Sequence, residues 1–163
     1  MQTIYCFVLA AALALSQQAN NPPFKIAITA ENPTVVAGAD VTINVSLTNT
    51  SDHDVDEGIM YMDGIGLDGC FVFDLRDENG KEVPKRIYPY EEFRTGRVVF
   101  RTIRAGETLK QDQTVSLRYD MQKPGKYTIQ VARRVTRDHK DDIKSNIITI
   151  TVTANTKVEG IKR

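Results

Sequence analysis

Two short polar segments contain both histidines of this chain, and an aspartate directly precedes each histidine. The first is Ser51-Asp-His-Asp-Val-Asp-Glu57 and the second is Arg137-Asp-His-Lys-Asp-Asp142. Carboxylate oxygens together with imidazole can bind Zn²⁺, and carboxylates alone can bind Ca²⁺. Aspartate is equally favoured at solvated hairpin tips, where it bonds its own turn backbone. Both interpretations stay open, and the metal hypothesis assigns as ligands Asp52, His53, Asp54, Asp138, His139 and Asp141.

A third segment, Arg86-Ile-Tyr-Pro-Tyr-Glu-Glu-Phe-Arg94, interleaves aromatic and charged residues. Tyrosine, phenylalanine and arginine are enriched among the anchor residues of protein interfaces. The segment therefore predicts a protein-binding surface formed by Tyr88, Tyr90, Phe93 and Arg94. The alternative is that these aromatic side chains fold back onto an edge of the domain.

Catalytic motifs are weak in this sequence. The segment Gly64-Ile-Gly-Leu-Asp-Gly69 matches G-x-G-x-x-G, but a strand pattern follows it where a dinucleotide site needs a helix. No nucleophile elbow is present, and Cys70 has no neighbouring base. We therefore expect a protein that is not an enzyme and that has no cofactor other than the Ca²⁺ or Zn²⁺ ion considered above. A metal-dependent enzyme at those two loops is kept as a further alternative.

Alternation of apolar and polar residues at period two runs through the chain, with little helical periodicity. The pattern predicts an all-β fold, an immunoglobulin-like antiparallel sandwich of two sheets and seven or eight strands. In such a sandwich the two Asp-His loops lie at the same end. The predicted strands cover residues 24–30, 39–48, 55–62, 70–76, 97–103, 107–117, 126–134 and 143–153.

The stretch Asp120 to Arg134 contains the clearest fold signal. Pro124 and Gly125 stand in the order of a type II turn. Tyr127 then begins a strand, at the place where sandwiches of this kind have a tyrosine whose hydroxyl bonds upstream backbone. Ile129 stands where a disulfide-bonded domain would have cysteine, and the chain has no tryptophan, so a disulfide-free sandwich is expected.

Four segments carry a family resemblance, and they span most of the region from Phe24 to Thr153: Val36–Ser51, Phe73–Pro84, Arg104–Thr108 and Lys123–Tyr127. In this order they resemble elements of exported bacterial β-sandwich domains. The layout is similar to the intracellular-proteinase-inhibitor type of sandwich and to the amino-terminal domain that precedes deuterolysin-type zinc peptidases. The resemblance implies an immunoglobulin-like fold, and a proteinase inhibitor or pro-domain-like regulator that acts in trans.

The first residues indicate export. Ile4 to Leu15 form an apolar run that ends in Ala14-Leu15-Ser16, a small-x-small cleavage pattern. We therefore expect a signal peptide over 1–16, a linker over 17–23, the sandwich over 24–153 and a flexible tail over 154–163. The protein is expected to be secreted or periplasmic and not anchored in a membrane.

The charge balance gives no attraction to nucleic acid. The sequence has 21 Lys and Arg residues and 21 Asp and Glu residues, a formal net charge of zero. A protein partner is the expected kind of ligand. The sequence thus favours a secreted, non-catalytic immunoglobulin-like domain for binding or structural support, with the inhibitor or regulator and the metal-dependent enzyme as alternatives.

Overall fold

The computed structural model describes residues 23–62, 71–86, 96–133 and 143–155. These residues form an all-β, immunoglobulin-like sandwich of two sheets, as the alternation predicts. The described ranges contain no cysteine, so no disulfide joins them. Alternate residues of both sheets point inward and form one apolar core, which includes Ile26, Ile28, Ile43, Val45, Leu75, Ile129, Val131, Ile150 and Val152.

The first sheet has the order β1-β3-β7. Its antiparallel strands are β1 (Phe24–Ala30), β3 (Thr42–Asn49) and β7 (Thr108–Thr114). After β7 the chain turns into the 3₁₀ helix η2 (Val115–Leu117), so the strand predicted over 107–117 is shorter than expected. There Ser116 Oγ accepts a hydrogen bond from Val41 N–H at 2.9 Å, which replaces a strand-to-strand bond.

The second sheet has the order β2-β10-β8-β5, and a short strand β9 also pairs with β8. Residues 34–36, which lie between two of the predicted strands, form a strand parallel to β10. The strand expected over 143–153 is split in two, because Ser145 Oγ accepts the Val131 N–H and interrupts the regular ladder. The strands are β2 (Thr34–Val36), β5 (Phe71–Arg76), β8 (Gly125–Arg133), β9 (Ile143–Lys144) and β10 (Ile148–Thr153).

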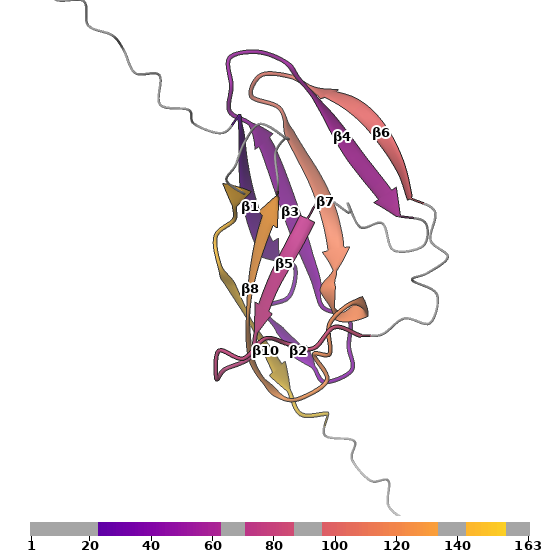
Figure 1. The fold of residues 1–163 in the computed structure, drawn as a ribbon. Helices are drawn as coiled ribbons and strands as arrows, with labels where there is room; N and C mark the ends of the chain where they lie inside the picture. The colour runs from indigo at the N-terminus through magenta and orange to yellow at the C-terminus, as the bar shows by residue number, and fades with distance from the viewer. Residues whose placement is uncertain (1–22, 63–70, 87–95, 134–142, 156–163) are drawn as a thin grey trace, which may run out of the picture.

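A separate two-stranded ribbon consists of β4 (Val55–Met62) and β6 (Gly96–Ile103). Figure 1 shows it beside one end of the sandwich, continuing from the ends of β3 and β7. The sequence predicted both strands, but not that 55–62 would lie outside the two sheets. The strand beside β8 is instead β5. Period-two patterning tells which face of a strand is buried, and it does not tell which strand is its neighbour.

The bend before β8 differs from the expected type II turn. Gly125 has φ of 153°, whereas the third residue of a type II turn has φ near +80°. The Lys123 carbonyl accepts a hydrogen bond from the Tyr127 hydroxyl at 2.7 Å, so the upstream bond expected of that tyrosine is present.

Within the described ranges no helix is long and apolar enough to span a bilayer.

Candidate ligand-binding cavity

The predicted metal ligands fall into two groups in the structure. Asp52, His53 and Asp54 lie in the exposed loop after β3, whereas Asp138, His139 and Asp141 lie outside the described residues. A hydrogen bond of 2.9 Å joins His53 Nδ1 and Asp52 Oδ1, and it lowers the pKa of the Asp52 carboxyl.

The aspartate after His53 has a structural partner as well. Asp54 Oδ1 accepts the Ala105 N–H at 3.0 Å, which ties this loop to the turn between β6 and β7. In the part of the chain that the structure describes, no three His, Cys, Asp or Glu side chains form a group that could hold a metal ion. Asp52 and Asp54 thus have partners within or beside the loop, and the metal site shared by the two Asp-His loops stays a prediction.

The predicted protein-binding residues Tyr88, Tyr90, Phe93 and Arg94 lie outside the described ranges, as does the G-x-G-x-x-G segment. The residues that lead into the predicted surface are described, and they line a cavity of about 240 Å³. We call it the cationic cavity. Its lining residues come from β5, from the segment after the turn at 77–80 and from the segment after η2: Phe71, Val72, Phe73, Lys85, Arg86, Arg118 and Tyr119.

Backbone hydrogen bonds hold two of the three walls together. Arg86 N–H donates to the Arg118 carbonyl at 2.7 Å, and Asp120 N–H donates to the Pro84 carbonyl at 2.9 Å. Lys85 and Tyr119 form an isolated antiparallel bridge between these bonds. Residues more than 30 positions apart in the sequence are thereby fixed side by side, which places their cationic side chains around one cavity.

Tyr119 connects this paired segment to β5. Its ring is buried, and its hydroxyl donates a hydrogen bond of 3.1 Å to the Phe73 carbonyl. Burial raises the pKa of Tyr119, and the nearby charge of Arg118 opposes that rise only in part. The hydroxyl therefore stays protonated near neutral pH and keeps its bond to β5.

The lining residue Phe71 also contacts the buried side chain of Arg133. The guanidinium carbon of Arg133 lies 5.0 Å from the centre of the Phe71 ring, within the range of a cation–π interaction. Arg133 is only 1% exposed, and as the last residue of β8 it continues the buried face of Tyr127, Ile129 and Val131. Its guanidinium packs on the Phe71 ring, which belongs to the cavity lining.

The described lining of the cationic cavity combines positive charge with aromatic rings. Among the described residues that line it, three are cations, three are aromatic and none is a carboxylate. Arginine and lysine bind carboxylates, sulfates and phosphates by charge-assisted hydrogen bonds, which strengthen beside apolar walls. Tyr119 is the one lining side chain with a hydroxyl, and that hydroxyl already donates to Phe73. The arrangement is suited to anion binding and offers no nucleophile paired with a base.

A wider hollow adjoins the cavity and shares Lys85 and Arg86 with it. Its volume is about 530 Å³, and Pro84, Asp120 and Gln122 complete its lining. The two depressions are neighbours on the surface, since the same lysine and arginine line both. Sequence reasoning missed this site, because Lys85-Arg86 and Arg118-Tyr119 form no spaced motif and meet only through the backbone pairing.

Comparison with known proteins gives similarity of fold only. No family model matches this chain, and no curated protein matches it, so the two resemblances in the sequence stay predictions.

Three solved structures align with most of this chain at low identity. The CARDB domain of the PF1109 protein from Pyrococcus furiosus, solved in complex with di-metal ions, is 10% identical over 81% of this chain and 94% of that chain, with a TM-score of 0.46. The DNA glycosylase AlkC of Pseudomonas fluorescens is 13% identical over 81% of this chain and 31% of that chain, with a TM-score of 0.42. The sporulation control protein Spo0M of Bacillus subtilis is 14% identical over 82% of this chain and 50% of that chain, with a TM-score of 0.43. The chain thus spans half or less of the last two proteins.

Proposed function

We propose that this protein is an exported, non-catalytic binding domain and that the cationic cavity binds an anionic group of its ligand. The observation that carries the proposal is the convergence of Lys85, Arg86 and Arg118 beside aromatic side chains, with no carboxylate among the described lining residues. A pocket for a whole small metabolite commonly measures about 300–1,000 Å³. At about 240 Å³ the cavity suits a single side chain or chain end of a larger ligand.

The binding test uses fluorescein-labelled hexaglutamate and fluorescence anisotropy. The double substitution Lys85→Glu, Arg86→Glu reverses two charges in the exposed wall, and we expect it to weaken binding by at least about tenfold. The wild-type affinity should also fall with added salt, because the lysine and arginine are partly solvated.

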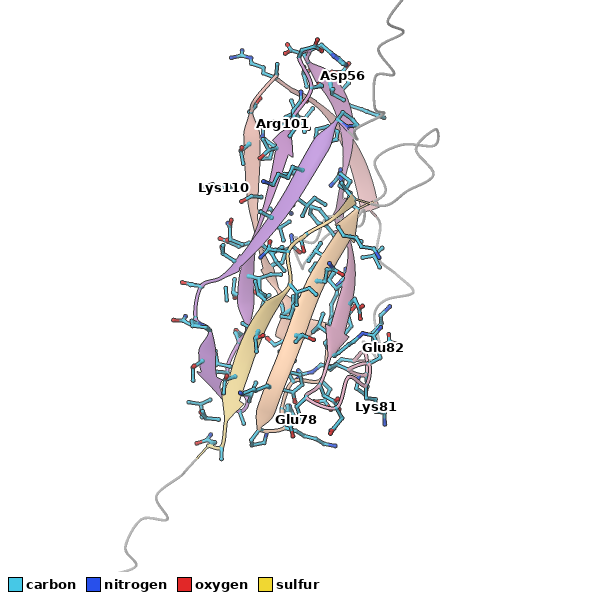
Figure 2. The ribbon with its side chains drawn as sticks, turned by 90° about the vertical axis from the view of Figure 1, so that its left-hand side faces the viewer. Asp56, Glu78, Lys81, Glu82, Arg101 and Lys110 are labelled. Atoms are coloured by element: carbon cyan, nitrogen blue, oxygen red, sulfur yellow. The ribbon has the colours of Figure 1, made fainter. Side chains whose placement is uncertain are left out.

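The matched control is Lys25→Glu, Lys110→Glu, which makes the same change in net charge. Both lysines are exposed on the first sheet, and Figure 2 shows Lys110 on the opposite side of the sandwich from Glu82, which precedes the cavity segment. The control variant should bind the peptide within about twofold of the wild type. An equal loss in both variants would mean that only net charge matters, and the assignment of the cavity would be wrong.

An inhibitor or regulator that acts in trans would be one form of such a binding domain. A panel of exported proteases distinguishes it, since an inhibitor blocks at least one of them at stoichiometric dose. The proposed export is tested separately by the intact mass of protein recovered outside the cytoplasm. We expect a chain that begins at Gln17, whereas an uncleaved chain at Met1 would contradict the signal-peptide assignment.

A further inference from the structure

β5 is an edge strand. In the order β2-β10-β8-β5 it pairs with β8 on one side only. Alternate residues of an edge strand direct their N–H and C=O groups away from the paired neighbour. Phe73 and Leu75 are such residues, because their carbonyls bond to Tyr119 Oη and to Val83 N–H rather than to β8. By the same alternation, Phe71 also directs its backbone groups to the outer edge.

The outer edge is closed over its second half. Val83 N–H donates to the Leu75 carbonyl at 2.9 Å, and Arg76 forms a bridge with Glu82. The Phe73 carbonyl accepts a hydrogen bond from the Tyr119 hydroxyl. Among the described residues, no strand pairs with the remaining part of this edge, toward which the N–H and C=O of Phe71 and the N–H of Phe73 are directed.

The open part of the edge coincides with the cationic cavity. Phe71, Val72 and Phe73 form one wall of it. This part of the strand has no charged residue, and Val72 is 62% exposed on its outward face. The closed part instead has the ion pair of Asp74 with Arg76 at 3.0 Å. Natural edge strands are usually protected by charged side chains on the strand itself or by covering segments, so an apolar strand edge that no described segment covers is a template for another strand.

We propose that the ligand is an extended acidic segment of a partner protein, which adds as a strand to β5 at Phe71–Phe73 and places a carboxylate in the cationic cavity. This inference rests on the proposed function and names the ligand class of the same site. Strand addition supplies main-chain hydrogen bonds, and adjacent pockets select the side chains. Lys85, Arg86 and Arg118 are the selecting groups here.

The closed half of the edge limits how the segment can lie. In a parallel pairing, one residue of the added strand donates its N–H to the Phe71 C=O and accepts the Phe73 N–H at its own C=O. A parallel strand that passes these groups runs toward Leu75, where the segment ending in Val83 occupies the edge. A segment added in this direction therefore stops or turns beside the cations. The bound carboxylate comes either from an acidic side chain there or from the carboxyl terminus of the partner.

The test uses the labelled peptide Thr-Val-Thr-Val-Glu-Glu and two N-methylated forms with the methyl groups on alternate residues. Each form blocks the amides along one edge of the extended peptide and leaves the other edge intact. Strand addition requires one intact edge, so we expect one form to lose at least about tenfold in affinity and the other to stay within about threefold. Equal affinities of the two forms would overturn strand addition.

The same peptide with an amidated carboxyl terminus separates the two sources of the carboxylate. A loss of about tenfold or more assigns the cavity to the terminal carboxylate, and unchanged affinity assigns it to a glutamate side chain. The Lys85→Glu, Arg86→Glu variant separates the two proposals. Binding that depends on those residues but not on the methylation pattern would overturn strand addition and leave the anion-binding site standing. If the Lys85→Glu, Arg86→Glu variant binds the peptide with the wild-type affinity, both the anion-binding site and strand addition would be overturned.

Amide hydrogen exchange gives a second measurement. The N–H groups of Phe71 and Phe73 face the open edge, and we expect their exchange to slow at least about tenfold when the acidic peptide binds. Val72 and Asp74 serve as internal controls, because their amides face β8 and are already bonded in the ladder. Peptide binding that leaves the Phe71 and Phe73 amides unchanged would contradict addition to this edge.

Discussion

Asn49 joins three segments of the chain through one buried side chain. Its Nδ2 donates to the carbonyls of His53 and Ile103, both at 2.9 Å. Its Oδ1 accepts from the N–H and the hydroxyl of Ser51. The residue is fully buried at the point where the β4–β6 ribbon leaves the sandwich. Asn49 therefore connects the ribbon to the core by hydrogen bonds that water cannot replace.

Asn49→Asp should destabilise the protein by about 3 kcal/mol. The substitution removes both donors and places a charge among carbonyl oxygens in the interior. Urea unfolding measures the change, and Asn32→Asp is the control because Asn32 is exposed in the turn after β1. The control should stay within about 0.5 kcal/mol of the wild type. A loss of similar size in both variants would contradict the role of Asn49.

Tyr127→Phe should cost about 1 kcal/mol or more, because the Tyr127 hydroxyl donates to the Lys123 carbonyl at 2.7 Å and its ring is buried. Urea unfolding with an unchanged m value measures this cost. The substitution Lys123→Ala is a matched control, since it keeps the accepting backbone carbonyl and changes only an exposed side chain. If Tyr127→Phe is as stable as the wild type, the hydrogen bond contributes nothing to the corner.

At the scale of elements, a side chain joins the two sheets. Asn146 lies between β9 and β10, and its Nδ2 donates to the Ile28 carbonyl at 3.0 Å. Its Oδ1 accepts the Ile28 N–H at 2.9 Å. An asparagine thus pairs with the outer edge of β1 as a neighbouring strand would. The break between β9 and β10 makes this possible, because it frees Asn146 from the regular ladder.

Asn146→Ala should raise the hydrogen-exchange rate of the Ile28 amide and lower global stability by about 1–2 kcal/mol. The amides of Ala27 and Thr29 are internal controls, because alternation in β1 directs them toward β3. Their exchange should follow the global change only. Equal acceleration at all three amides would mean that the substitution unfolds β1 as a whole and that Asn146 has no local role.

At the scale of the whole molecule, the buried tyrosines set an alkaline limit to stability. Burial raises the pKa of both Tyr119 and Tyr127 above the ordinary value of 10.0. Above about pH 10 the unfolded chain releases these protons while the folded protein retains them. Their contribution to stability is therefore complete below pH 10 and declines as the pH rises through the folded-state values.

The double variant Tyr119→Phe, Tyr127→Phe should lose stability less steeply above pH 10 than the wild type, although it is less stable at pH 7. Urea unfolding at a series of pH values measures both slopes. The two proteins differ only at these two tyrosines, so the contributions of all other groups cancel in the comparison. Parallel curves for the two proteins would show that neither tyrosine contributes to the alkaline transition.

Metal binding is also tested at the scale of the molecule. We expect the same melting temperature in EDTA and in added Ca²⁺ or Zn²⁺, since Asp52 and Asp54 already have partners in the loop. A metal that binds only the folded state raises the melting temperature. A rise that is lost on substitution of His53 and His139 would instead establish the two Asp-His loops as a shared metal site.

The sequence by itself determined the fold class, most strand positions and the role of Tyr127. Alternation at period two reports which face of each strand is buried, and local turn residues mark where strands end. Both signals come from neighbours in the chain. They predicted β1, β3, β5 and β8 closely, and they identified the tyrosine whose hydroxyl reaches four residues upstream.

Only the tertiary structure decided which strands are neighbours and where charges meet. The placement of β4 with β6, outside the two sheets, depends on pairing over about 40 residues. The cationic cavity depends on backbone bonds between Pro84–Arg86 and Arg118–Asp120. The edge at Phe71–Phe73 depends on the position of β5, which has only β8 as a neighbour among the described strands. Such long-range contacts leave no periodic trace in a single sequence, because burial patterning fixes a strand's face and leaves its partner free.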